Sequence, residues 1–218
     1  MSQNEHLPEA IYDYLLSHNP PVDALTQELI DETAALGPIH RMQLGVDQAA
    51  FLAFLVGLLG AKFVVEVGTF TGLSSLAMAR ALPESGRILC CDISEEYTNM
   101  ARRYWDRAGL SDRITLELGP AAETLAALAP DQRVDLALLD ANKEGYIGYY
   151  DALVPRLSPQ GVIVADNIFM GGRVVDAESG SNAEAMVAFA EHVQADPRTE
   201  TVIIPIGDGF TLSRLAPD

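Results

Sequence analysis

The chain has 218 residues, of which 49% are hydrophobic, and its formal net charge is −17 at pH 7. That length fits one domain over residues 1–218 with a full hydrophobic core. So acidic a protein is a poor match for nucleic acid or an anionic membrane, because both are bound through patches of Lys and Arg.

The first residues and the cysteines predict a cytoplasmic protein. The opening MSQNEHLPEA has neither the basic start nor the apolar core of a signal peptide. The longest apolar stretch, residues 49–61, is shorter than the roughly 20 residues that a membrane span needs. Cys90 and Cys91 are neighbours in a predicted strand, so their side chains should point to opposite faces and remain thiols in a reducing compartment.

Helices are predicted over the first sixty residues. Segments 4–18 and 21–36 carry apolar residues three and four positions apart, as on one face of a helix. Segment 45–62 is apolar nearly all round, which is typical of a helix packed on both sides. Proline and glycine separate these segments.

From residue 62 onward, short β-branched runs alternate with amphipathic segments. Strands are predicted at 63–67, 87–92, 113–118, 134–140 and 161–166. Helices are predicted at 73–82, 95–108, 121–128, 146–157 and 182–194. Such alternation indicates an α/β fold with parallel strands and helices on both faces of the sheet. At the end of the chain, 201–206 and 210–215 flank Gly-Asp-Gly and predict an antiparallel hairpin.

The five predicted parallel strands all end in an acid, an amide or a glycine. These endings are Glu66-Val67-Gly68, Asp92, Gly119, Asp140 and Asp166-Asn167. Ligands of an open parallel sheet bind beyond the carboxyl ends of its strands. We therefore expect a polar site above a hydrophobic sheet.

The segment EVGTFTGLSS, residues 66–75, follows the first predicted strand and opens a helix. Gly68 and Gly72 let the backbone turn sharply and approach a ligand, but they lack the three-glycine spacing of a dinucleotide site. Asp92, about 24 residues after Gly68, can accept both hydroxyl protons of a ribose. Together they indicate S-adenosylmethionine rather than NAD. A plain strand-to-helix turn, and an acid favoured by a helix dipole, remain the alternatives.

Three oxygen-bearing side chains from two strand ends, Asp140, Asp166 and Asn167, suit Mg²⁺, Mn²⁺ or Ca²⁺ rather than Zn²⁺. They can equally be strand-end caps, with Asp166 and Asn167 forming a turn. Lys143 follows Asp140 by three residues. A nearby divalent cation would favour its neutral amine, which is a general base, whereas most lysines at a helix start are only solvated.

Several segments resemble the cation-dependent class I O-methyltransferases, the caffeoyl-CoA O-methyltransferase and catechol O-methyltransferase group. They are FVVEVGTFTGLSSLAMARALPESGRILCCDIS, GPAAETL, VDLALLDANKEGY, GVIVADNIFMGGRVV and PIGDGFTLSRL. The likeness runs from Met42 to Leu215 in order and spacing. It implies a Rossmann-like class I methyltransferase fold, with a mostly parallel seven-stranded sheet, a C-terminal antiparallel hairpin and helices on both faces. It also implies a homodimer, and residues 1–41 fall in the family's variable helical segment.

The resemblance assigns roles to residues of this chain. It implies cofactor contacts from Met42, Leu44, Glu66, Gly68, Thr69, Ser74, Asp92, Ala121 and Asp140. It implies metal ligation by Asp140, Asp166 and Asn167, and catalysis by Lys143 together with Asp140. Two departures stand out: Asn142 replaces an aspartate of many relatives, and Phe169-Met170 stands where plant members often carry tryptophan.

The expected reaction is a divalent-metal-dependent transfer of a methyl group from S-adenosylmethionine to a hydroxyl of a catechol-type, vicinal dihydroxy aromatic molecule, with Mg²⁺ the first choice of cation. A hydroxycinnamoyl-CoA ester or a larger natural-product scaffold is the alternative acceptor, and the acidic chain disfavours the ester because of its phosphates. A non-catalytic S-adenosylmethionine-binding protein would not need Asp140, Lys143, Asp166 and Asn167 together.

Overall fold

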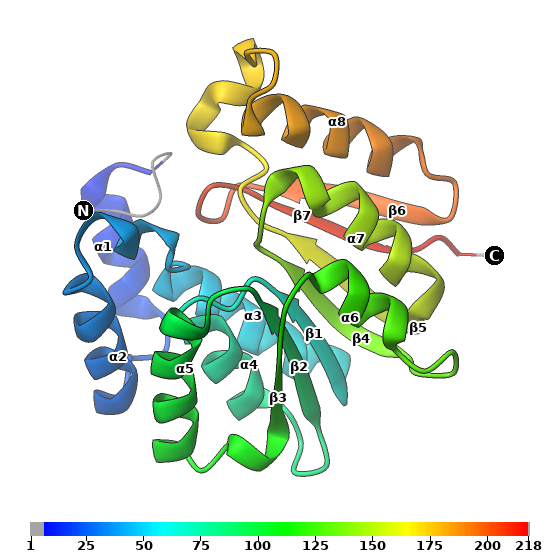
Figure 1. Ribbon diagram of the computed structural model, residues 1–218. Helices are drawn as coiled ribbons and strands as arrows, with labels where there is room; N and C mark the ends of the chain where they lie inside the picture. The colour runs from blue at the N-terminus through cyan, green and yellow to red at the C-terminus, as the bar shows by residue number, and fades with distance from the viewer. Residues whose placement is uncertain (1–6, 218) are drawn as a thin grey trace.

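Seven strands form one mixed sheet in the computed structural model, which describes residues 7–217 (Figure 1). The strands are β1 (Phe63–Val67), β2 (Arg87–Asp92), β3 (Ile114–Leu118), β4 (Val134–Leu139), β5 (Leu157–Ala165), β6 (Thr199–Ile204) and β7 (Phe210–Leu215). The α-helices are α1 (Glu9–His18), α2 (Ala24–Ala34), α3 (Val46–Leu59), α4 (Leu73–Ala81), α5 (Glu95–Arg107), α6 (Ala121–Ala127), α7 (Tyr146–Leu153) and α8 (Asn182–Ala195). Short 3-10 turns are η1 (Gly37–Met42), η2 (Ser111–Arg113), η3 (Lys143–Gly145), η4 (Val154–Arg156) and η5 (Met170–Asp176).

The strand order is β3-β2-β1-β4-β5-β7-β6. Strands β1 to β5 are parallel, while β7 runs antiparallel to both β5 and β6. The prediction of a parallel sheet that ends in a reversed hairpin is confirmed. The order reverses between β1 and β4, and at such a switch point the loops diverge and leave room for a ligand.

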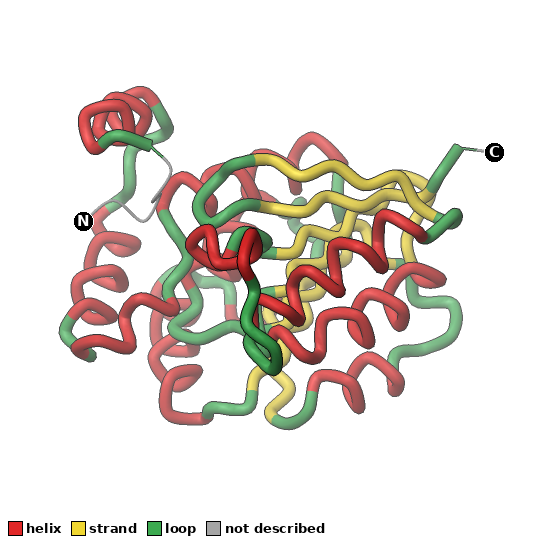
Figure 2. The backbone as a smooth tube through the Cα atoms, turned by 90° about the horizontal axis from the view of Figure 1, so that it is seen from above, coloured by secondary structure: helices red, strands yellow, loops and turns green. Residues whose placement is uncertain are grey.

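Two hydrophobic cores lie on opposite faces of the sheet, because successive side chains of a strand alternate between faces. Val64 belongs to the core under α2 to α5, and its neighbour Val65 to the core under α6 to α8. Figure 2 shows the helices on both sides of the strands. Cys90 and Cys91 divide in the same way, each buried in a different core, and both are free thiols, as predicted.

Two predicted boundaries were wrong, and proline explains both. Strand β5 begins at Leu157 rather than at residue 161, because an irregularity in its pairing with β4 accommodates Pro159 within the strand. Helix α7 ends at Leu153 rather than at 157, because Pro155 cannot continue an α-helical hydrogen-bond ladder and the chain tightens into η4. The remaining elements differ from prediction by only a few residues at their ends.

Helix α3 is not covered on both sides as its apolar sequence predicts. Leu52 and Val56 are buried in the core, but Phe54 and Leu58 are 68% and 69% exposed. By length and composition alone the run Gly37–Leu59 would be long enough to cross a membrane. Core helices pass the same test, and 44% of that apolar window is buried inside the fold.

Helix α1 packs on α3 through a buried polar contact. The hydroxyl of Tyr12 in α1 donates to Oδ1 of Asp47 in α3, at 3.0 Å, and both residues are buried. Helix α2 begins at its N-cap Asp23, which accepts from the backbone of Thr26. The predicted helix over 4–18 begins at Glu9, and residues 4–6 lie outside the described part of the chain.

Candidate active site at the carboxyl edge of the sheet

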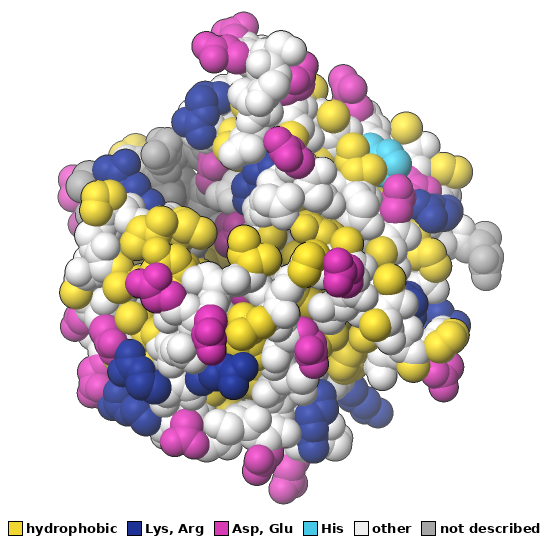
Figure 3. Space-filling view, viewed as in Figure 1, with side chains coloured by type: hydrophobic (Ala, Val, Ile, Leu, Met, Phe, Trp, Pro, Cys, Tyr) yellow, Lys and Arg dark blue, Asp and Glu magenta, His cyan; other side chains and the backbone are white. Residues whose placement is uncertain are grey.

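The surface is hollowed between the N-terminal helices and η5 (Figure 3). Acidic side chains are visible inside this hollow, and Lys or Arg side chains flank it. Strands β1, β2, β4 and β5 all end on the same edge of the sheet because they are parallel. The side chains predicted from the strand endings are therefore brought to one place.

The glycines of the turn after β1 are required by the protein's own packing. Gly68 has φ +94°, and a Cβ there would overlap the backbone carbonyl of Asp140. Gly72 has φ +89°, and its Cβ would lie 2.6 Å from that of Ala101 in α5. These glycines therefore let the turn pack closely against the backbone after β4 and against helix α5, in addition to any ligand.

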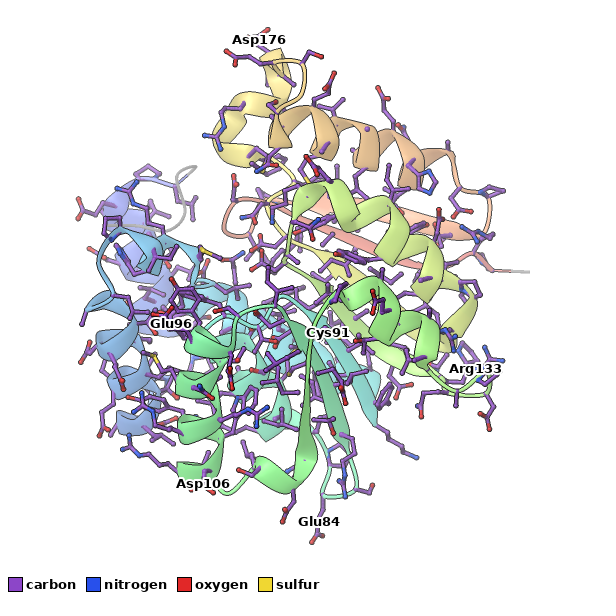
Figure 4. All side chains as sticks on the ribbon, viewed as in Figure 1. Glu84, Cys91, Glu96, Asp106, Arg133 and Asp176 are labelled. Atoms are coloured by element: carbon purple, nitrogen blue, oxygen red, sulfur yellow. The ribbon has the colours of Figure 1, made fainter. Side chains whose placement is uncertain are left out.

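Asp92 ends β2, directly after Cys91, which Figure 4 labels between the sheet and the α6–α7 layer. Its Oδ2 accepts from the backbone nitrogens of Thr69 and Phe70, each at 2.8 Å, and its Oδ1 accepts from Ser94 at 2.8 Å. An ionised carboxylate can accept about four hydrogen bonds, so capacity for one more donor remains on Oδ1. Asp92 therefore also fixes the glycine turn, and its predicted contact with ribose hydroxyls stays a prediction.

Glu66 is a fully buried acid at the end of β1. Its Oε1 accepts from the hydroxyl of Ser74 at 2.6 Å, and burial raises the pKa of its carboxyl to about 7, against that hydrogen bond. Within the described chain, Oε2 of Glu66 and the hydroxyl of Thr69 are buried without a hydrogen-bond partner. Buried polar atoms are seldom left unpaired, so this pair beside the glycine turn fits a polar ligand such as S-adenosylmethionine.

Lys143 lies among the predicted metal ligands. Its Nζ donates to Oδ1 of Asn167 at 2.6 Å and to Oδ1 of Asp140 at 3.2 Å. It also donates to the hydroxyl of Tyr146 at 2.7 Å. The Lys143 and Asp140 side chains are only 11% and 18% exposed. Oxygens from the ends of β4 and β5 therefore already converge on one positive charge.

Asp166 completes the predicted ligand set. Its Oδ1 accepts from the side-chain amide of Gln48 at 2.9 Å and from the backbone of Asn167 at 2.6 Å. Burial, followed by the charge of Asp140, raises the pKa of the Asp166 carboxyl, and Lys143 opposes that rise. Asn167 is left-handed, with φ 62°, a conformation that asparagine tolerates better than most residues. In this conformation its side-chain oxygen accepts from Lys143.

The donor set fits a hard divalent cation. Two carboxylates and one amide would ligate through oxygen only, and the Lys143 ammonium contacts two of them, Asp140 and Asn167. Within residues 7–217, no group of three or more His, Cys, Asp and Glu side chains is gathered as a metal site. Asp140, Asp166 and Asn167 include only two residues of these types, because the third proposed ligand is an asparagine.

Tyr146 accepts a hydrogen bond from the Lys143 amine. Its hydroxyl donates to the backbone carbonyl of Leu139 at 3.0 Å, so it can only accept from Lys143. Burial, then the charges of Asp140 and Asp166, raise the pKa of Tyr146, which keeps that proton in place. In this arrangement the Lys143 amine can contact a hydroxyl group of a substrate and exchange a proton with it.

The remaining predicted cofactor residues differ in position. Met42 ends η1 and is 56% exposed, and Ala121 is the buried first residue of α6. Leu44 is buried in the core beneath α3. Asn142, which departs from the family pattern, accepts from the hydroxyl of Tyr149 at 2.8 Å.

Sequence reasoning missed Gln48 and Tyr146. Tyr146 stands three residues after Lys143, a spacing that brings side chains together on a helical turn, so its contact had a local signal. Gln48 and Asp166 are 118 residues apart, and no local pattern joins them.

Comparisons with known proteins identify the family of this chain. The sequence profile of the O-methyltransferase family matches residues 17–216. The chain is 35% identical to "Probable caffeoyl-CoA O-methyltransferase 2" of Dictyostelium discoideum, covering 93% of this chain and 90% of that protein. It is 33% identical to caffeoyl-CoA O-methyltransferase 2 of Petunia hybrida, over 94% and 90% of the two chains.

The fold matches solved structures of the same kind. An O-methyltransferase from Bacillus cereus, in complex with S-adenosylhomocysteine, superposes with a TM-score of 0.86 at 28% identity, covering 95% of this chain and 97% of that one. The prediction of a Rossmann-like class I methyltransferase fold is confirmed. The chain therefore belongs to the O-methyltransferase family and is an S-adenosylmethionine-dependent enzyme.

Proposed function

We propose that this enzyme methylates one hydroxyl of a vicinal dihydroxy aromatic molecule with the help of a divalent cation, Mg²⁺ foremost. The observation that carries the proposal is the convergence of Asp140 and Asn167 oxygens on the Lys143 amine, beside Asp166. A cation held by these oxygens could bind two adjacent hydroxyls of the substrate, and Lys143 would be a base for one of them.

Asp140, Asp166 and Asn167 would hold the cation. When bound, a divalent cation supplies positive charge that makes ionisation of a phenol hydroxyl less costly. Lys143, unprotonated at that moment, accepts the proton of the reacting hydroxyl at its Nζ. Tyr146 keeps this nitrogen in position by accepting one of its hydrogen bonds.

The phenolate oxygen then forms a bond to the methyl carbon of S-adenosylmethionine while the carbon–sulfur bond breaks. The electron pair of that bond stays on sulfur, so S-adenosylhomocysteine leaves as a neutral thioether. Lys143 returns its proton to solvent. No further acid is needed, and catalysis is mainly positioning and charge stabilisation.

The names of the relatives favour a hydroxycinnamoyl thioester over a free catechol as acceptor. The net charge of −17 opposes a CoA ester at long range. Locally, however, Arg41 in η1 and Arg173 in η5 are both exposed, on the two segments that flank the hollow in Figure 3. We therefore place the ester first among the acceptors to be tested.

The experiment compares caffeic acid and its CoA ester as acceptors in one turnover assay, read by mass spectrometry, with Mg²⁺ or with excess EDTA. Methylation of either acceptor that stops in EDTA and returns with Mg²⁺ is expected, and Asp140→Ala should abolish the Mg²⁺-dependent turnover. Full activity in EDTA would remove the cation from the proposal. Methylation of monohydroxy analogues at the same rate would remove the vicinal diol.

We also propose a homodimer. Phe51 of α3 packs against Phe210 of β7, with ring centroids 5.9 Å apart, and Phe54 and Leu58 continue along that helix to the exposed surface. Leu212 follows Phe210 by two residues in β7 and so lies on the same face of the sheet as Phe210. Its partner in β6, Val202, is 58% exposed. A second copy that covers this apolar surface would remove it from water.

A further inference from the structure

Gln48 joins two parts of the active site that are remote in sequence. It lies in the first turn of α3 and is only 4% exposed. Its Oε1 accepts from the backbone nitrogen of Gly45 at 2.9 Å, and its Nε2 donates to Oδ1 of Asp166 at 2.9 Å. One side chain therefore caps its own helix and contacts a predicted metal ligand.

The two partners fix which way the amide of Gln48 points. The backbone nitrogen of Gly45 can only donate, so it requires the amide oxygen, and the amide nitrogen is then the atom that faces Asp166. A flipped amide would lose both hydrogen bonds. The orientation is thus determined by the chemistry of the partners.

The turn between β6 and β7 presses on the same amide. Gly207 is buried with φ +58°, and a Cβ on it would overlap Cδ and Nε2 of Gln48. The Gln48 amide is therefore enclosed by the α3 N-terminus, by Asp166 and by this turn. Little freedom remains for it to rotate.

The contact determines which oxygen of Asp166 is left for a ligand. Both of its hydrogen bonds, from Gln48 and from the backbone of Asn167, fall on Oδ1, and Oδ2 accepts none from residues 7–217. We infer that Gln48 is a positioning residue, which holds Asp166 in the rotamer that directs Oδ2 to the cation. The inference rests on the proposed cation dependence. Groups that orient a metal ligand typically affect metal affinity by 10–100-fold.

The test measures Mn²⁺ binding directly, from the electron paramagnetic resonance signal of free Mn²⁺, in protein saturated with S-adenosylhomocysteine. Gln48→Met keeps the length of the side chain and removes both hydrogen bonds, and it should weaken Mn²⁺ binding by about 10–100-fold. Gln48→Asn keeps the amide but is one methylene too short for both partners, so it should lose affinity similarly and serves if the Met variant does not fold.

Tyr12→Phe is the matched control. It removes a buried hydrogen bond to Asp47, the residue next to Gln48 in the same helical turn, without touching Asp166. Its Mn²⁺ affinity should stay within about twofold of wild type, as expected for a site that shares no partner with Asp166. Equal losses in the Tyr12 and Gln48 variants would mean that both only loosen α3, and would overturn the assignment.

A double-mutant cycle with Gly207→Ala gives a second readout. The added methyl group displaces the Gln48 amide, so Mn²⁺ binding should weaken in the wild-type background and change by no more than about twofold further in the Gln48→Met background. Additive losses would overturn the inference. Wild-type protein that binds no Mn²⁺ would instead refute the cation dependence itself, whereas wild-type binding with an unchanged Gln48→Met variant refutes only the role of Gln48.

Discussion

The side-chain nitrogen of Lys143 lies 2.6 Å from Oδ1 of Asn167, although the two residues follow different strands and are 24 positions apart. The same nitrogen contacts Asp140 and Tyr146. The amine is thus placed by three side chains at the carboxyl end of the parallel strands, and two of them, Asp140 and Asn167, are proposed cation ligands.

Removal of this amine should affect catalysis far more than cofactor binding. We expect Lys143→Ala to lower kcat by roughly 10²–10⁴-fold, the usual contribution of a general base, with S-adenosylhomocysteine affinity nearly unchanged. Lys62→Ala is the control, because Lys62 is the chain's other lysine and precedes β1 at the opposite edge of the sheet. Stopped turnover with equally lost cofactor binding would point to a structural role for Lys143.

Tyr146→Phe separates positioning from stability. The change removes one of the three acceptors of Lys143 and leaves the buried carbonyl of Leu139 without that donor, at a cost of about 1–3 kcal/mol in the free energy of unfolding. We expect kcat to fall about tenfold as the amine loses one of its anchors.

Tyr150→Phe is the matched control for that variant. Tyr150 lies in the same helix, and its hydroxyl bonds with Thr199, away from the site. Thermal unfolding and kcat should both be measured for the two variants. We expect both variants to lose stability and only Tyr146→Phe to lower kcat. Equal kcat values in the two variants would exclude a positioning role for Tyr146.

The buried Glu66 predicts a pH-dependent stability of the cofactor-free protein. Its pKa is about 7 in the folded chain and near 4.5 when exposed, so between these values the folded state binds the extra proton. The free energy of unfolding should therefore fall as pH rises from about 4.5 to 7, by roughly 3 kcal/mol from this group, and level off above.

Glu66→Gln should remove that slope. Urea unfolding at several pH values would measure it, with Glu84→Gln as the control, since Glu84 is exposed near the opposite end of the sheet (Figure 4). A Glu66→Gln variant whose stability still falls as steeply between pH 5 and 7 would show that another group is responsible.

The exposed side of α3 predicts how the proposed dimer can be broken. Phe54→Glu or Leu58→Glu places a charge within the apolar surface, and we expect monomers in analytical ultracentrifugation with the fold retained. Val175→Glu, on an 81% exposed residue of η5, is the control for the added charge. Dimers that persist in both α3 variants would place the interface elsewhere.

Local chemistry determined much of this molecule. The alternation of apolar strands with amphipathic helices specified the parallel sheet, since each pattern buries its own face only in that element. The polar residues at the ends of β4 and β5 specified where Asp140 and Asn167 meet, because parallel strands end on one edge. The opposite faces of Cys90 and Cys91 followed from the two-residue repeat of a strand.

Only the tertiary structure decided the rest, because those features depend on contacts between distant segments. The sequence does not indicate that Gln48 contacts Asp166, which is 118 residues away. It also does not indicate that Asp92 accepts three backbone hydrogen bonds or that Leu44 packs in the core. Nor does it show which side of the apolar α3 stays uncovered. Periodicity fixes which face of an element is apolar, whereas the order of strands and the packing of helices decide what that face meets.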